Sequence, residues 1–307
     1  MRNAFINELS LFAKDDKDII MMVGDLGYGV LKPFYEELPN QFINAGISEQ
    51  NMLSMAAALG MEHKKVYTYS IGNFDSLRAI EQIRNDILYH DANVKIISVG
   101  SGMGYGALGM SHHATEDLGI MNCLPNIIIF SPSDPIEAKK IAELTVKTNK
   151  PCYIRLGKGN EPIINSEKVK LEIGKAIKIV DGKDVAIFVA GPGASEAYEA
   201  AKELNEQNIS TALYSFPTVK PIDEKLIKKV FKDYKLVITF EEHNIHGGLG
   251  SIVAFVAAGQ RNNRAVLKCI GLNDEYVSTV GSQEYLRDVY NINAKAIIDV
   301  VKKELGD

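Results

Sequence analysis

Short apolar runs alternate with longer stretches of helical periodicity along the whole chain, and the pattern occurs twice. Each apolar run has the length of a buried strand. The predicted strands lie at 19–23, 66–71, 94–99, 127–130 and 152–156 in the first half and at 185–190, 212–216, 236–240 and 267–270 in the second. Strands separated by helices connect as crossovers and form a parallel sheet with helices on both faces. The sequence therefore predicts an α/β fold with two consecutive doubly wound, mainly parallel sheets.

The stretch from Gly157 to Lys183 interrupts this alternation. It is polar and charged, contains a proline and several glycines, and lacks sustained periodicity. We therefore predict a first domain at 1–160, a linker at 161–183 and a second domain at 184–307. With 307 residues in the chain, each domain is long enough to bury a core of its own.

Helical periodicity is clearest from Asp75 to His90, where apolar residues recur every three or four positions and define one stripe. Ser133-Asp134-Pro135 predicts a helix start, because a capping side chain precedes a proline in the first turn. Two more helices are predicted near 283–290 and 294–305 at the end of the chain.

Charge and hydropathy exclude two classes of function. The net charge is −5 with acidic and basic residues interleaved, whereas nucleic-acid binding needs a concentrated basic face. No apolar stretch approaches the length of about 18 residues that a membrane span requires. We therefore expect a cytoplasmic protein that binds neither nucleic acid nor membrane.

The run from Gly104 to Gly109 has the glycine spacing of a dinucleotide-binding loop and follows a predicted strand. Such a loop needs a helix that opens at its last glycine, whereas Ser111, His112 and His113 follow here. We interpret the run as a flexible loop that lines a pocket. The two histidines lie beyond the carboxyl end of a strand, the usual ligand-binding edge of a parallel sheet, so they are candidate functional residues.

A second polar cluster follows a strand of the second half. Glu241, Glu242, His243 and His246 are residue types that bind metal ions, but their spacing differs from that of metalloproteases. Polar residues at a strand end, just before Gly247-Gly248, predict an interface or a pocket rim. We predict no metal ligands in this chain.

The most specific segment is Asn44-Ala45-Gly46-Ile47-Ser48-Glu49-Gln50-Asn51, which leads into a predicted helix at 52–61. Together with Gly24-Asp25-Leu26 before it and residues 74–84 after it, this segment resembles the pyrimidine-binding domain of transketolases and related thiamine diphosphate enzymes. The resemblance continues through Arg155-Leu156-Gly157-Lys158.

Three motifs of the second half resemble the transketolase C-terminal domain. They are Pro221-Ile222-Asp223, Glu241-Glu242-His243 and Gly247-Gly248-Leu249-Gly250. The resemblance thus covers nearly the whole chain in order. It implies a pyrimidine-binding domain followed by a transketolase C-terminal-like domain.

The resemblance implies thiamine diphosphate as cofactor, whose aminopyrimidine must tautomerise before the thiazolium carbon can lose its proton. In the family a buried glutamate drives this step by sharing a proton with the pyrimidine ring nitrogen, and Glu49 matches it. Phe74 matches the aromatic ring that stacks on the aminopyrimidine. Asp25 and Ile47 fall among the cofactor-binding positions.

The resemblance also implies substrate-binding residues. His112 matches the family histidine that hydrogen-bonds a substrate oxygen and helps to move protons, and His113 lies beside it. Arg2 and Lys158 fall where the family places cations for a sugar phosphate. A surface salt bridge is the alternative interpretation of these two cations.

One family motif is missing. Transketolases bind the cofactor diphosphate and Mg²⁺ through a Gly-Asp-Gly motif with a downstream asparagine, and the sequence contains no Gly-Asp-Gly. In family members that are cut in two, this motif lies on a separate N-terminal subunit. The resemblance therefore implies a partner subunit that holds the diphosphate and Mg²⁺, in an α₂β₂ heterotetramer.

The substrate region departs from the family at three positions. Leu108 stands where transketolases carry an aspartate that reads a donor hydroxyl, Gly100 where they carry a histidine, and Gly29 where they carry a serine. These changes remove hydrogen-bonding partners for a ketose phosphate. We expect transfer of a two-carbon ketol unit between sugars or sugar phosphates, with the identity of donor and acceptor open.

Two other functions fit parts of the same sequence. The β-subunit of a 2-oxo acid dehydrogenase complex shares the pyrimidine domain, the glutamate and the C-terminal domain, although the double glutamate and histidine at 241–243 fit transketolases better. A non-catalytic structural or regulatory subunit could retain the fold without activity. The presence of Glu49, Phe74 and His112 argues against this last alternative.

Overall fold

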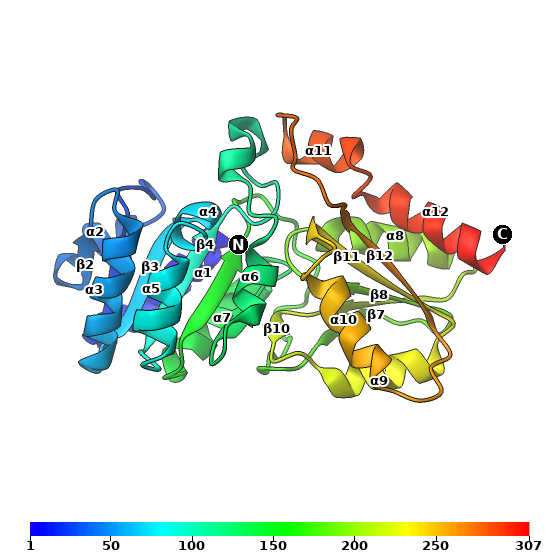
Figure 1. Ribbon diagram of the computed structural model, residues 1–307, viewed down its shortest axis with the longest axis horizontal. Helices are drawn as coiled ribbons and strands as arrows, with labels where there is room; N and C mark the ends of the chain where they lie inside the picture. Colours follow the sequence, from blue (N-terminus) through cyan, green and yellow to red (C-terminus); the bar gives the residue numbers. More distant parts are fainter. Residues whose placement is uncertain (307) are drawn as a thin grey trace.

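The computed structural model describes residues 1–306 and contains two α/β units, each built on a mostly parallel sheet (Figure 1). The predicted fold class is confirmed. The first sheet has the order β10-β5-β6-β4-β3-β1-β2 and the second has the order β12-β11-β8-β9-β7. The strands of the first sheet are β1 (Ile19–Val23), β2 (Phe42–Asn44), β3 (Lys65–Ile71), β4 (Val94–Val99), β5 (Ile128–Phe130), β6 (Cys152–Leu156) and β10 (Thr218–Lys220). Those of the second are β7 (Ile177–Val180), β8 (Val185–Val189), β9 (Thr211–Ser215), β11 (Leu236–Asn244) and β12 (Val266–Leu272).

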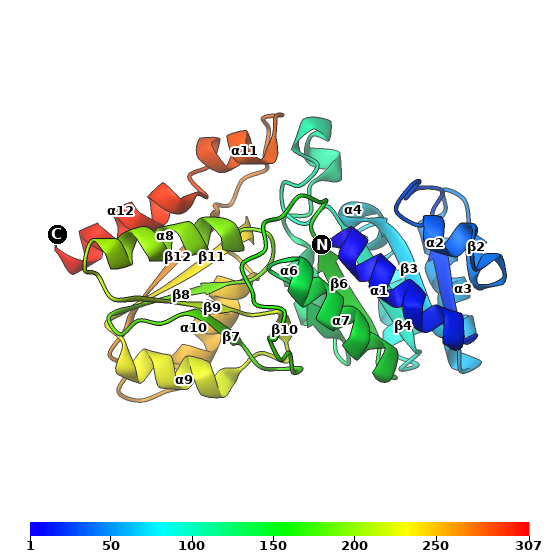
Figure 2. The same ribbon diagram turned by 180° about the vertical axis from the view of Figure 1, so that it is seen from behind.

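Helices cover both faces of each sheet (Figures 1 and 2). In the first unit, α1 and α7 lie on one face, and α3, the α5–η2 segment and α6 lie on the other. In the second unit, α8 and α12 pack together on one face, while α9 and α10 cover the other. The helices of the first half are α1 (Arg2–Asp15), α2 (Lys32–Tyr35), α3 (Glu49–Met61), α4 (Gly72–Asp75), α5 (Ile80–Gln82), α6 (Asp117–Cys123) and α7 (Pro135–Lys147), with the π-helix η2 (Ile83–Leu88) and short 3₁₀ turns η1 (Pro39–Gln41), η3 (Gly106–Leu108) and η4 (Met110–His112). Those of the second half are α8 (Ala194–Glu206), α9 (Glu224–Asp233), α10 (Leu249–Ala258), α11 (Gln283–Val289) and α12 (Ala294–Leu305).

Several local predictions are confirmed. Helix α7 begins at Pro135, and the Asp134 side chain accepts a hydrogen bond from the Glu137 backbone N–H at 2.9 Å, as expected of an N-cap. The two C-terminal helices start at the predicted residues. The run from Gly104 to Gly109 opens no long helix and forms only the 3₁₀ turn η3.

The predicted continuous helix from Asp75 to His90 is wrong. The chain forms α4, then a turn, then α5 and the π-helix η2. Asp75 is fully buried and accepts a hydrogen bond from Ser98 of β4 at 3.0 Å, which ties the end of α4 to the sheet. The apolar stripe is correspondingly broken, since Ile83 is buried whereas Leu77 is 39% exposed.

The two halves of the chain are connected by more than the linker between them. Strand β10 comes from the second half of the sequence, yet it pairs antiparallel with β5 of the first sheet. The range 161–183, predicted as a linker, contains β7, which pairs antiparallel with β9. Both strands are short edge strands, and neither has the sustained apolar run on which the strand predictions depended.

The apolar core is also continuous across the two halves. Leu118 and Met121 of the first half belong to the same buried cluster as Phe216 and Leu249 of the second. On this face the two halves therefore share one core, whereas each half also has a buried cluster built almost entirely from its own residues. None of the helices within residues 1–306 combines the length and the apolarity needed to cross a membrane. A cytoplasmic location stays a prediction.

Candidate active site

The carboxyl ends of β1, β3, β4 and β6 meet at one edge of the first sheet, because these strands are parallel neighbours. The segments that leave this edge carry the predicted functional residues. Asp25 follows β1, Phe74 follows β3, the loop with His112 follows β4, and Lys158 follows β6. The fold thus gathers residues from distant parts of the sequence at the edge where parallel sheets bind ligands.

Glu49 is the first residue of α3 and is only 1% exposed. Its Oε2 accepts a hydrogen bond from Arg78 Nη1 at 2.7 Å. Its Oε1 is buried and has no hydrogen-bond partner among the described residues. Beside it lies Gly24, where a Cβ atom would stand 3.4 Å from Oε1. A buried carboxylate oxygen without a partner is costly, so a hydrogen-bond donor from outside the chain would stabilise it.

A row of aromatic rings extends from this carboxylate along the edge. The guanidinium of Arg78 lies 4.5 Å from the centroid of the Phe74 ring. The Phe74 and His112 ring centroids are 5.2 Å apart, and the His112 and Tyr105 centroids are 6.3 Å apart, both in edge-on geometry. Lys158 Nζ lies 5.0 Å from the centroid of Tyr105. Glu49, Phe74, His112 and Lys158, which the sequence placed in one site, therefore form a connected series in space.

Arg2 reaches the same series from helix α1. Burial raises the pKa values of Tyr69 and Tyr105, and the positive charge of Arg2 acts to lower both. Burial is the larger effect and raises the pKa of Tyr69 to about 12. Arg2 and Lys158 also line one cavity of about 840 Å³. This cavity lies between the two halves, since Glu196 and Arg287 of the second half complete its wall. The two cations predicted for a sugar phosphate thus face a common space.

The remaining predicted residues differ from these in exposure. Asp25 is exposed, and its carboxylate accepts hydrogen bonds from Asn44 Nδ2 at 2.9 Å and from the Tyr28 hydroxyl at 2.8 Å. These two hydrogen bonds lower the pKa of Asp25, and the bond from Asn44 has the larger effect. Ile47 is 77% exposed. His113 is buried with neither ring nitrogen hydrogen-bonded in the described structure, and desolvation lowers its pKa.

Tyr105 is a site residue that the sequence argument did not single out. A Cβ atom at Gly100 would lie 2.1 Å from the Tyr105 ring, and Gly100 has a φ of +88°. The tyrosine ring therefore takes the space that a side chain at position 100 would need. Of the other two departures from the family, Leu108 is 55% exposed, and open space surrounds Gly29.

Asp75 is a second residue that was missed. It adjoins Phe74 in sequence, and burial, with the charges of Asp117 and Glu49, raises its pKa well above the usual range. One oxygen accepts the Ser98 hydroxyl and the other has no partner among residues 1–306. Its position inside a predicted helix concealed it, because a surface aspartate is the ordinary expectation there.

The polar residues Glu241 and Glu242 of the second half hold structural elements together. Glu241 accepts hydrogen bonds from the Leu249 and Gly250 N–H groups at 2.6 and 2.8 Å and so caps α10. Glu242 accepts the Met103 N–H at 3.1 Å together with donors from Gln283 and Arg287. Since Met103 belongs to the first half, Glu242 fastens the two halves together, which fits the predicted interface.

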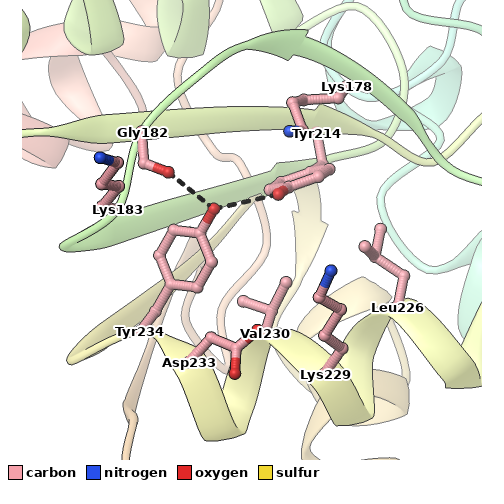
Figure 3. A pocket seen from close by; sticks show the side chains of 9 residues that line it. All are labelled: Lys178, Gly182, Lys183, Tyr214, Leu226, Lys229, Val230, Asp233 and Tyr234. Carbon is pink, nitrogen blue, oxygen red and sulfur yellow. Dashed lines mark hydrogen bonds between the residues drawn. The ribbon is translucent and has the colours of Figure 1, made fainter.

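A further cavity of about 340 Å³ lies in the second unit, between β9, α9 and the turn before β8 (Figure 3). At its back, the Tyr234 hydroxyl contacts the Tyr214 hydroxyl at 3.1 Å and donates to the Gly182 carbonyl at 2.9 Å. None of the predicted site residues lines it. The cavity is thus separate from the candidate active site, which lies at the edge of the first sheet and extends into the cavity between the halves.

The transketolase pyrimidine-binding domain model matches residues 1–162, and the transketolase C-terminal domain model matches residues 174–297. The chain belongs to the transketolase family. Apart from β10, which joins the first sheet, the two family segments correspond to the two α/β units, and the candidate site lies in the segment that matches the pyrimidine-binding domain.

Relatives that match along nearly their full length support this membership. A transketolase family protein of Methanocaldococcus jannaschii, named provisionally as a transketolase C-terminal section, is 37% identical over 99% of this chain and 97% of its own length. An apulose-4-phosphate transketolase subunit of Phocaeicola vulgatus is 33% identical over 98% of this chain and 97% of its own. A solved structure described as a split gene transketolase, inactive beta4 tetramer, has a TM-score of 0.88 and 32% identity, covering 99% of this chain and 97% of that one.

Proposed function

We propose that this chain is the C-terminal subunit of a heteromeric, thiamine diphosphate-dependent transketolase that transfers a two-carbon ketol unit between sugars or sugar phosphates. The observation that carries the proposal is the buried Oε1 of Glu49, which has no partner in the described structure. It lies at the carboxyl edge of the sheet in a family whose members use thiamine diphosphate.

The residues present fit the pyrimidine end of that cofactor. The group supplies, when bound, a carbanion at its thiazolium carbon that accepts and releases the ketol unit. Glu49 offers a buried oxygen to a ring nitrogen, and Gly24 leaves the space beside that oxygen free. Phe74 offers a half-buried ring for stacking. Ile47 and Asp25 lie at the rim and on the strand end of the same edge.

Each side chain then has a distinct task. Glu49 holds or accepts the proton at Oε1, in a buried place where water does not compete for it. His112 lies between Phe74 and Tyr105 and is positioned to hydrogen-bond a substrate oxygen and move a proton there. Arg2 and Lys158 bind the anionic end of a phosphorylated sugar in the cavity between the halves. His113 is assigned to the same substrate site, because it adjoins His112 and both its buried ring nitrogens lack a partner in the described structure.

The partner follows from what the sequence lacks. Without a Gly-Asp-Gly motif the chain has no family residues for the diphosphate and Mg²⁺, so the N-terminal subunit holds both. The similar split-gene protein, described as an inactive beta4 tetramer, supports a division of activity between two subunits. We propose an α₂β₂ assembly in which the partner faces the edge that carries Glu49.

The substrate is proposed to differ from that of single-chain transketolases. Leu108 presents an exposed apolar side chain where the family aspartate would bind a hydroxyl, and Tyr105 fills the space next to Gly100. The Tyr105 ring thus takes the place of the family histidine beside position 100, and the Leu108 side chain takes the place of the family aspartate. A similar protein acts, by its name, on apulose 4-phosphate, which supports an uncommon sugar phosphate as the substrate.

The test is reconstitution with the candidate N-terminal subunit, thiamine diphosphate and Mg²⁺, followed by calorimetry of cofactor binding. We expect binding only when both chains are present and weaker binding in Glu49→Ala. Ketose phosphates and 2-oxo acids are then compared as donors. Tight cofactor binding by the chain alone would contradict the proposal, and acylation of a lipoyl domain from a 2-oxo acid would assign the complex to a different reaction.

A further inference from the structure

Arg78 contacts both residues that the proposed function assigns to the aminopyrimidine. Its Nη1 donates to Glu49 Oε2 at 2.7 Å, and its guanidinium carbon lies 4.5 Å from the centroid of Phe74. The Glu49 side chain is 1% exposed, whereas that of Arg78 is 45% exposed. One planar, cationic group thus bridges the buried carboxylate and the aromatic ring from the solvent side.

A guanidinium and an aminopyrimidine ring offer the same features to these two residues. Both are flat, both carry N–H groups in the plane, and both can lie against an aromatic face. Arg78 bonds Glu49 Oε2 and the proposed pyrimidine would bond Oε1, so the two groups compete for the face of Phe74 that Arg78 now covers.

We propose that Arg78 is a placeholder, which occupies the aminopyrimidine site of the chain without its partner and leaves that site when the cofactor enters. This inference rests on the proposed function. The physical reason lies in Glu49: a buried carboxylate without any partner is strongly unfavourable, and Arg78 supplies a charge and a donor until the cofactor does.

The exposure of Arg78 makes the exchange feasible. The released guanidinium regains water, but the buried Glu49 carboxylate loses its charged partner, so the exchange requires the incoming pyrimidine to supply a donor to Glu49 as Arg78 leaves. The cofactor must nevertheless displace Arg78, so its apparent affinity is reduced by the fraction of chains in which the site is open. The chain alone therefore binds the pyrimidine end weakly, and contacts to the diphosphate on the partner overcome the competition.

The decisive experiment uses the full chain without its partner and the fragment 4-amino-5-hydroxymethyl-2-methylpyrimidine, with affinity measured by calorimetry. Arg78→Leu and Arg78→Gln are compared with the unaltered protein. Arg84→Leu is the matched control, because Arg84 is exposed and its guanidinium donates a hydrogen bond to Asn85, a residue outside the proposed site. We expect the Arg78 variants to bind the fragment about tenfold more tightly than the unaltered chain and the control.

The outcomes separate the placeholder from its alternative. Weaker, equal or undetectable binding by both Arg78 variants would overturn the proposal and make Arg78 a positioning residue that holds Glu49. Two variants are used because Arg78→Gln keeps a hydrogen-bond donor and protects against loss of folding. Guanidinium ¹⁵N signals provide a second readout: we expect the Arg78 signal to move on addition of the fragment and the Arg84 signal to stay.

Failure of the proposed function is recognised separately. In the assembled pair, Glu49→Gln is titrated with thiamine diphosphate and Mg²⁺ beside the Arg78 variants. If Glu49→Gln binds the cofactor as well as the unaltered pair does, the assignment of Glu49 is wrong. If only the Arg78 variants fail to tighten fragment binding, the placeholder is wrong and the assignment of Glu49 stands.

Discussion

Two strand ends in this molecule carry buried glutamates, and they differ in how completely those glutamates are bonded. At the edge of the first sheet, Glu49 Oε1 has no partner within residues 1–306. At the end of β11, Glu241 and Glu242 have hydrogen bonds to both carboxylate oxygens. Glu241 and Glu242 are bonded within the described structure, whereas Glu49 keeps one oxygen for the donor that the proposed function supplies. Under the proposed function, the first edge binds the cofactor and the second edge holds the fold together.

The largest expected effect is on catalysis by the first edge. Glu49→Gln in the reconstituted enzyme should lower kcat by about 10²- to 10⁴-fold, because the amide cannot take part in proton sharing. The melting temperature should stay within the range of the control Glu62→Gln, at the exposed other end of α3. Steady-state kinetics and thermal unfolding measure the two quantities. A large loss of stability with little loss of kcat would show that Glu49 serves the fold rather than catalysis.

The second effect is on stability at the other edge. Glu242→Ala leaves Arg287 buried without its main carboxylate and removes a bond to Met103 across the two halves. We expect a loss of about 3–5 kcal/mol in the free energy of unfolding, measured by urea titration. Glu284→Ala, on the exposed side of α11, is the control and should change it little. Equal losses in both variants would show that the buried network is unimportant.

The third effect is a pH dependence of stability. Burial raises the pKa of Glu241 to about 7, although hydrogen bonds from Gly250 and Leu249 act to lower it. The folded chain then binds this proton more tightly than the unfolded chain, so the contribution of Glu241 is full below about pH 4.5 and is lost as the pH rises through 7. Urea unfolding at pH 5 and pH 7 should show a smaller difference in Glu241→Gln than in the unaltered protein. If Glu241→Gln shows the same difference in the free energy of unfolding between pH 5 and pH 7 as the unaltered protein, other groups cause the pH dependence.

The smallest effect concerns the rim of the first edge. Lys158 is exposed and lies over Tyr105, so Lys158→Met should leave stability unchanged. The KM for a phosphorylated sugar should rise several-fold, as expected for loss of one surface charge contact of about 1 kcal/mol. Lys170→Met, at another exposed position, is the control. If Lys158→Met leaves the KM for phosphorylated sugars unchanged, the phosphate binds elsewhere in the cavity.

The sequence located the first edge more fully than the second. Phe74, His112 and Lys158 follow separate predicted strands, and parallel strands end at a common edge, so their proximity could be predicted. Glu49 follows the short edge strand β2, which was not predicted, and only the family resemblance placed it in the site. Arg78 and Tyr105 could not be assigned in this way. Their roles depend on side-chain directions in a broken helix and a glycine loop, which no periodicity encodes.

The domain boundary shows the same limit. Long apolar runs at 19–23 or 185–189 identify central strands because a strand buried on both faces needs apolar residues throughout. β7 and β10 lie at sheet edges, where this demand is weaker, and their short sequences gave no signal. That β10 joins the sheet of the first half follows only from the three-dimensional arrangement.

The sequence by itself determined the alternation of strands and helices, the helix caps and the ordered motifs of the transketolase family, because these depend on neighbours along the chain. The tertiary structure alone decided which buried carboxylates are satisfied. Glu49 and Glu242 are the same residue type beside similar apolar strands, yet one faces a half-exposed arginine and the other a buried network across two halves. Hydrogen bonding of a buried group depends on atoms brought from far away in sequence, and only folding places them there.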